Sequence, residues 1–161
     1  QTLRKVYRMV GAASGEVLNL TQIARVLDIG RPLVRRCVEA LESLYLVEAV
    51  PVWSGADRFE RSIRSPKHVV TDSGWLCGLL GQCAVDPNVL PNVRPDDVRR
   101  LLSGWTWAQL AALVDDDSPW ALRHFALRTG LTVEWLLEHR ENGRLIARRS
   151  CGASRWTKPA R

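Results

Sequence analysis

The sequence predicts an α+β protein with a helix-turn-helix in its first half and a strand-rich second half. Apolar residues recur at helical spacing up to about residue 44, and short apolar stretches bounded by turn residues follow. Apolar residues make up 46% and charged residues 25% of the 161 residues, which is typical of a globular protein. No apolar run approaches the ~20 residues of a membrane helix, and the charged N-terminal stretch lacks a signal-peptide core. We therefore expect a cytoplasmic protein that does not enter a membrane.

Three helices are predicted before residue 45. The first follows from the apolar residues between Leu3 and Val10 and ends at Gly11. The second runs to about Leu27. The third opens at Pro32, whose missing N–H needs no partner in the first turn of a helix.

The second and third predicted helices form a helix-turn-helix. Ala24 is small enough to let two helices cross closely, and Ile29 fills the angle between them. Asp28 stands in the turn where glycine is usual, and aspartate tolerates the left-handed conformation better than most residues. Two strand-like stretches flank residues 54–66, so the sequence predicts a winged helix with a long wing.

A winged helix permits DNA recognition through basic side chains in the helix and the wing. The candidate DNA-binding residues are Arg31, Arg35, Arg36, Arg58, Arg61, Arg64 and Lys67. Against this function, Glu39 and Glu42 on the same helix would repel phosphates. The net charge of +6 resides entirely from residue 140 onward, since residues 1–139 hold 16 basic and 16 acidic side chains. The alternative is that the module docks onto a partner or acts as a spacer.

Prolines at positions 87, 91 and 95 mark a linker between two domains. We predict a winged-helix domain over residues 1–82, a linker over 83–95, a second domain over 96–152 and a basic tail over 153–161.

The second predicted domain begins with a helix and ends with a hairpin. The apolar face expected on the helix consists of Val98, Leu101, Leu102, Trp105, Leu110 and Leu113. Two apolar stretches within residues 131–154 predict the strands of the hairpin. Most tryptophans fall on apolar faces and are expected in the core, among them Trp53, Trp75, Trp105 and Trp135.

These segments, in this order, resemble the C-terminal half of bacterial and archaeal AAA-type P-loop ATPases. The strongest segments are "NLTQIARVLDIGRPLVRRCVEALESLYLVEAVPVWS" and "RSPKHVVTDSGWLCGLLG", and the resemblance spans nearly all 161 residues. Such proteins carry a nucleotide-binding domain, a winged helix, and a C-terminal domain of unknown function similar to restriction endonucleases of the PD-(D/E)xK kind. No GxxxxGK[ST] motif occurs in this chain. The resemblance therefore implies that ATP and Mg²⁺ belong to an upstream domain, and the N-terminal Gln suggests a fragment; we expect no cofactor here.

The resemblance also maps a nuclease site onto this chain, with its chemistry lost. Ser103 and Gln109 occupy positions where glutamates are usual, and Glu134 replaces an aspartate. Arg149 and Cys151 fall where a glutamate and a lysine are expected. A Mg²⁺-dependent nuclease needs converging carboxylates and a lysine, whereas an arginine repels the metal and a thiol is a soft ligand. We expect no cleavage, no metal, and a pair between Glu134 and Arg149 across the hairpin.

Four functions follow from these observations. The favoured one is a non-catalytic C-terminal region of an AAA-type ATP-binding protein that contacts nucleic acid or a protein. The protein partner would be another protein or a second copy, bound through the winged helix. The alternatives are a DNA-binding transcriptional regulator, an active metal-dependent nuclease, and a decaying copy with no selected role.

Overall fold

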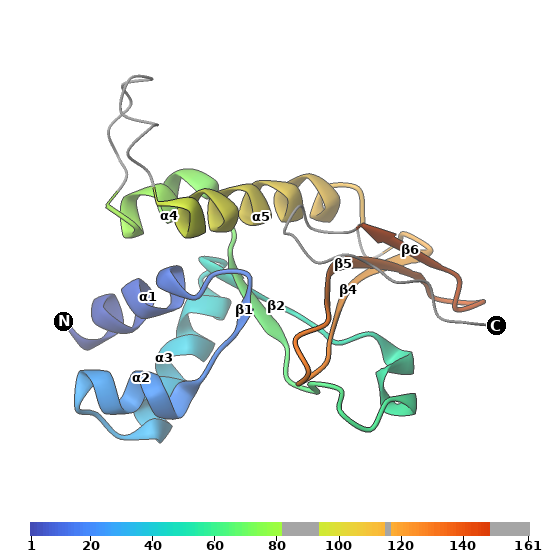
Figure 1. Cartoon of the computed structure of the whole chain (residues 1–161). Helices are drawn as coiled ribbons and strands as arrows, with labels where there is room; N and C mark the ends of the chain where they lie inside the picture. Colours follow the sequence, from blue (N-terminus) through green and yellow to red (C-terminus); the bar gives the residue numbers. More distant parts are fainter. Residues whose placement is uncertain (82–93, 115–116, 149–161) are drawn as a thin grey trace.

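The computed structural model describes residues 1–81, 94–114 and 117–148, and these residues form an α+β fold, as predicted (Figure 1). The described chain contains two three-stranded antiparallel sheets with helices packed beside them. Arg149, Cys151, the predicted tail and nearly all of the predicted linker lie outside the described residues. Within the described ranges, no helix is both long and apolar enough to cross a lipid bilayer.

The first half of the chain packs three helices against a small sheet. Its elements in order are α1 (Thr2–Ala12), β1 (Glu16–Val17), α2 (Leu20–Leu27), α3 (Arg31–Ser43), β2 (Val47–Val50) and β3 (Lys67–Val70). The strands pair in the order β1-β3-β2. Apolar side chains from the three helices meet Val47, Val70 and Leu76 in the largest core cluster, so burial of one face of each helix holds this half together.

The turn between α2 and α3 has the predicted geometry. The Asn19 side chain accepts a hydrogen bond from the Gln22 N–H at 3.0 Å and caps α2. Asp28 adopts the left-handed conformation with φ 52°, and the Ile29 N–H bonds back to the Ala24 carbonyl at 3.0 Å. Ala24 is buried and Ile29 packs partly buried against the core, as the sequence predicted.

Helix α3 ends in a Schellman motif with an unusual residue. The Leu46 N–H bonds the Leu41 carbonyl at 3.0 Å, and the Tyr45 N–H bonds the Glu42 carbonyl at 2.9 Å. Tyr45 takes the left-handed conformation, φ 55°, that glycine normally provides at this position. Its side chain is exposed, so burial of the ring does not offset the strain.

Replacing Tyr45 with glycine is therefore expected to stabilise the protein. The Tyr45→Gly variant should unfold in urea with a free energy about 1 kcal/mol higher than the native chain, because glycine adopts positive φ without strain. Tyr45→Ala is the matched control, since it removes the same ring but keeps a Cβ. Equal stability of the two variants would contradict the strain argument.

The second half consists of two helices and a three-stranded meander. Its elements are α4 (Ser73–Leu79), α5 (Pro95–Ala111), β4 (Trp120–Ala126), β5 (Thr132–His139) and β6 (Leu145–Arg148). The predicted hairpin is confirmed as the antiparallel pair β5–β6, with Leu137 opposite Ile146. Helix α5 runs beside α4 and over β3, above the first half in Figure 1.

The predicted apolar face of α5 is largely wrong. Leu102 and Trp105 are more than half exposed, whereas Ser103 and Gly104 are buried. The reason is close packing. A Cβ on Gly104 would lie 3.5 Å from a methyl of Leu76 and 3.9 Å from the Val70 carbonyl, so the small residues let α5 approach the rest of the fold. The larger apolar side chains next to these small residues, Leu102 and Trp105, therefore point toward solvent.

The expectation for the tryptophans is correct for two of the four. Trp135 is buried, and Trp53 packs partly buried against the cluster around Phe125. Trp75 and Trp105 are exposed.

The core cluster of the first half already contains Leu76 of α4, and a second hydrophobic cluster also joins the two halves. Trp135 of β5 packs with Val50 of β2 and Val69 of β3, and Trp107 and Leu122 contact the same cluster. The first sheet therefore contributes to the core beneath the second sheet. We infer that the two halves fold against each other.

The wing also joins the two halves. This segment, residues 51–66 between β2 and β3, contains a short 3-10 helix, Ser54–Arg58, and bridges to β4 and to the turn after β4 lie before and after that helix. Val52 forms a bridge with His124, and Ser62 forms one with Leu127. The wing is thus held against the second sheet.

Candidate nucleic-acid interface

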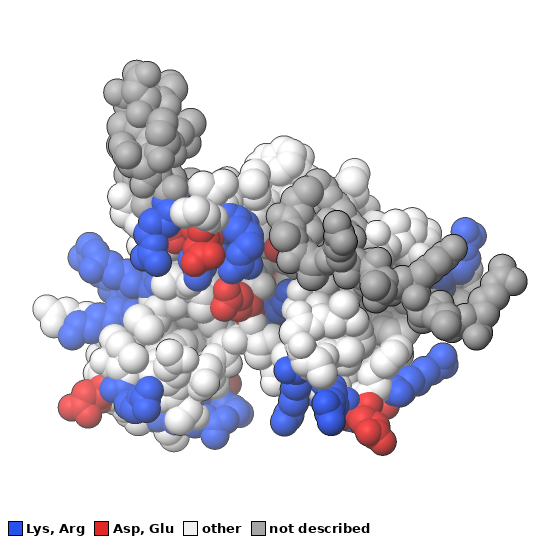
Figure 2. Space-filling view, in the orientation of Figure 1, with Lys and Arg blue, Asp and Glu red and all other residues white. Residues whose placement is uncertain are grey.

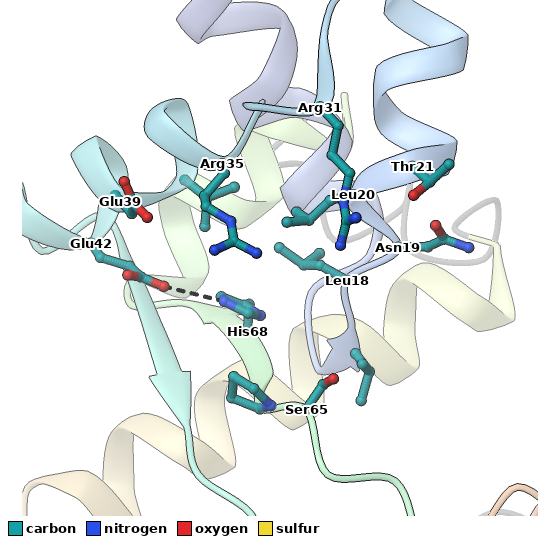
Figure 3. Close-up of a pocket in the computed structure, with 13 residues that line it drawn as sticks. Leu18, Asn19, Leu20, Thr21, Arg31, Arg35, Glu39, Glu42, Ser65 and His68 are labelled. Atoms are coloured by element: carbon teal, nitrogen blue, oxygen red, sulfur yellow. Dashed lines mark ion pairs between the residues drawn. The ribbon is translucent and has the colours of Figure 1, made fainter. Parts of the chain in front are cut away.

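A hollow of about 610 Å³ lies between α3, the start of α2 and the chain entering β3; we name it the α3 hollow. It is lined by Val17, Leu18, Asn19, Leu20, Thr21, Arg31, Arg35, Val38, Glu39, Glu42, Ser65, Pro66 and His68. Arg31 and Arg35 both extend from α3 into this space, one helical turn apart (Figure 3). Guanidinium groups donate paired hydrogen bonds to anionic oxygens, so Arg31 and Arg35 present donors of this kind to the hollow.

The acidic end of the α3 hollow is occupied by an internal pair. Glu42 Oε1 lies 3.2 Å from His68 Nε2 (Figure 3). Burial, with a smaller contribution from Glu39, raises the pKa of the Glu42 carboxyl, and burial lowers the pKa of the His68 imidazole. Both shifts favour the uncharged forms. Glu42 is thus engaged with His68, while Glu39 on the same helix stays exposed.

A second hollow of about 620 Å³, the wing hollow, lies where the wing meets the β4–β5 turn. It is lined by Glu60, Arg61, Ser62, Ile63, Arg64, Ser65, Arg128 and Thr129. The walls are fixed by backbone hydrogen bonds from the Arg128 N–H to the Arg61 carbonyl at 2.9 Å and from the Ile63 N–H to the Ala126 carbonyl at 2.8 Å. Three arginines therefore surround one space.

The two hollows are neighbours, since Ser65 lines both of them. In the space-filling view, basic side chains gather over the wing at the lower right and lie over the α2–α3 side at the lower left (Figure 2). An extended anionic chain lying across Ser65 would meet cations on both sides.

Four of the seven candidate DNA-binding residues line one of the two hollows, and three line neither. Arg31 and Arg35 line the α3 hollow, and Arg61 and Arg64 line the wing hollow. Arg36 and Arg58 are exposed but line neither hollow.

Lys67 is the exception among the candidates. It is only 7% exposed, so it cannot contact a phosphate at the surface, and that prediction is wrong. Its place in the first position of β3, beneath the junction of the two halves, accounts for its burial. Arg128 was missed instead, because nothing in "ALRTG" connects it with a wing more than sixty residues away.

Buried Lys67 lies in a polar cluster together with Glu134 and His124. Burial lowers the pKa of the Lys67 amine, the carboxylates of Glu134 and Glu16 oppose this shift, and Arg99 adds to it. His124 is fully buried, and its Nε2 lies 3.2 Å from the Ser65 carbonyl. Burial first, and the nearby Lys67 charge second, lower the pKa of this imidazole to about 4. Glu134 therefore has a cationic neighbour within the described chain.

The other positions that the resemblance maps to a nuclease site are Ser103, Gln109, Arg149 and Cys151. Ser103 is buried, and its hydroxyl has no hydrogen-bond partner within the described residues. Gln109 is exposed on α5. Arg149 and Cys151 lie outside the described residues, so their pairing stays a prediction. In the parts of the chain that the structure describes, no three His, Cys, Asp or Glu side chains are placed to hold a metal ion.

The class defined so far is an α+β protein with a helix-turn-helix and two adjoining hollows that are each lined by arginines. The chain belongs to the family described as "Domain of unknown function (DUF8612)", whose model matches residues 1–85. It is similar to "Uncharacterized protein Rv2008c" of Mycobacterium tuberculosis and "Uncharacterized protein Mb2031c" of Mycobacterium bovis, each 30% identical over 113 residues. The match covers 70% of this chain and only 24% of each relative. No solved structure matches the chain.

Proposed function

We propose that the chain is a non-catalytic, nucleic-acid-contacting region of a longer AAA-type ATP-binding protein. Its first half acts as a winged helix-turn-helix that holds the phosphate backbone in the α3 hollow. The observation that carries the proposal is the convergence of Arg31 and Arg35 on one hollow that continues, across Ser65, into a second hollow with three arginines.

The order of elements supports the winged-helix part of this proposal. Helix, strand, two helices and two strands follow one another, with the strands paired as β1-β3-β2 and a tight turn between α2 and α3. The sequence predicted the three helices and the two strands that flank residues 54–66, but neither β1 nor the order in which the strands pair. The observed arrangement places the first turn of α3 at the surface, where a recognition helix reaches its target.

Two further points bear on the longer protein. The matched part makes up 24% of the length of each curated relative, which leaves room for a nucleotide-binding domain in proteins of this kind. A Walker A motif in the reading frame upstream of Gln1 would support the ATPase assignment, and a nearby start codon would instead favour a stand-alone DNA-binding regulator. The proposal assigns no chemical reaction to these 161 residues.

Removing the two arginines of the α3 hollow is expected to weaken duplex binding. In Arg31→Ala/Arg35→Ala, affinity for a fluorescein-labelled DNA duplex should fall at least about tenfold at low salt, because two phosphate contacts are lost. The slope of log affinity against log salt should decrease by about two between roughly 50 and 200 mM salt. Fluorescence anisotropy measures both quantities.

The matched control is Arg4→Ala/Arg8→Ala, which removes two exposed arginines of α1 that line neither hollow. It changes the net charge equally, so it should reduce affinity by less than about twofold if the hollow is the site. An equal loss in both double variants would show that binding depends on overall charge, and the proposal would fail.

A second candidate function is protein docking, favoured by the apolar side chains left exposed on α4 and α5. Trp75, Leu102 and Trp105 each remain more than half exposed. Aromatic side chains exposed in this way are enriched at protein interfaces. Absence of any duplex affinity in the native chain would favour this function over nucleic-acid contact.

A further inference from the structure

We infer that the wing hollow is a phosphoryl-binding site built jointly by the two halves of the chain. This inference rests on the proposed function and extends it to a second site, whose arginines do not line the α3 hollow. Its ligand is a phosphate group with at least one charged oxygen, carried either by a nucleic-acid backbone or by a small phosphorylated compound.

The charge in the wing hollow is unbalanced toward the positive. Arg64 is paired, since its Nη1 lies 2.7 Å from Asp57 Oδ1. Arg61 and Arg128 form no ion pair with any acid among the described residues, and Glu60 is the one carboxylate in the lining. Guanidinium groups bind phosphate oxygens with paired hydrogen bonds, so two uncommitted arginines in one hollow favour this ligand.

The lining also contains an unsatisfied hydroxyl. Ser62 is only 6% exposed, and its Oγ has no hydrogen-bond partner within the described part of the chain. A buried hydroxyl without a partner destabilises the fold that contains it. A phosphate group in the hollow would offer this hydroxyl an acceptor once the Ser62 side chain turned toward the space that it lines.

The hollow exists only because the wing is attached to the second sheet. Arg61 and Arg64 come from the wing, whereas Arg128 comes from the β4–β5 turn. The hydrogen bond between the Arg128 N–H and the Arg61 carbonyl fixes the two segments side by side. The second half of the chain therefore supplies one cation directly to the ligand.

Titration of the full ¹⁵N-labelled chain with inorganic phosphate tests this inference. Amide resonances of Ser62, Arg128 and Thr129 should shift with saturation in the native chain. In Arg128→Ala, and in Ser62→Ala, the apparent affinity should fall at least about fivefold, because one charged and one neutral donor are removed. Arg144→Ala, which removes an exposed arginine at the opposite end of the second sheet, should leave it unchanged.

A competing oligonucleotide then distinguishes the source of the phosphate. Displacement of inorganic phosphate by a single-stranded oligonucleotide would support backbone contact, and failure to displace it would support a small phosphorylated ligand at the same site. Absence of any saturable shift at Ser62 and Arg128 with either probe would overturn the inference.

The proposed function fails separately from this inference. Arg31→Ala/Arg35→Ala should leave the phosphate-induced shifts at Arg128 intact, since neither arginine lines the wing hollow. Loss of those shifts in the double variant would mean that the two hollows are one site, contrary to the inference.

Discussion

Replacing Trp135 with alanine is expected to lower the free energy of unfolding of the whole chain by about 3–5 kcal/mol. Trp135 is 2% exposed, and its ring packs between Val50 and Val69 of the first sheet and side chains of α5 and β4. Removing it leaves a cavity at the contact between the two halves. Urea unfolding followed by far-UV circular dichroism should therefore show one transition, shifted to a lower midpoint.

Trp105→Ala is the matched control for this prediction. It removes the same side chain from a position where more than half of it is exposed, so the loss should stay below about 1 kcal/mol. Two separate transitions in Trp135→Ala, one unchanged from the native chain, would show that the halves fold independently.

The second large effect is a loss of stability against unfolding as the pH falls below 6.5. His124 has a pKa of about 4 in the folded chain against 6.5 for an unperturbed histidine, so between these values the unfolded chain binds a proton that the folded chain does not. The stability that neutral His124 provides is complete above pH 6.5 and is lost as the pH falls toward 4. The free energy of unfolding should decrease by about 3 kcal/mol over this range from His124 alone.

The His124→Gln variant isolates this contribution. Glutamine can still donate a hydrogen bond to the Ser65 carbonyl but does not titrate. The raised pKa values of Glu42 and Glu48 act in the opposite direction, because their folded forms take up a proton at higher pH than the unfolded chain. Subtracting the free energy of unfolding of the variant from that of the native chain at each pH therefore cancels the contribution of Glu42 and Glu48. Parallel stability curves from pH 7 to about 4 would refute the assignment to His124.

The helix-turn-helix was predictable because its signals are local. Asn19 caps a helix that begins next to it, Asp28 occupies a single left-handed position, and Pro32 suits a first turn. The α5 helix and the β5–β6 hairpin were predictable for the same reason, since each depends on spacing within a few residues.

The exposure of individual side chains was much less predictable. The expected core positions Trp105 and Leu102 lie toward solvent, and the expected surface cation Lys67 is buried. Helical spacing identifies an apolar face, but it cannot tell which face meets a neighbour when small residues such as Gly104 permit closer packing.

The sequence alone determined the α+β class, the three N-terminal helices with their tight turn, and the hairpin, because caps, turns and periodicity act over a few residues. Only the tertiary structure decided that the wing lies against β4, that Arg128 joins Arg61 in one hollow, and that the Glu134 carboxylate acts on buried Lys67. Those contacts join segments some sixty residues apart. They depend on how two sheets and α5 pack together, and no local pattern encodes that packing.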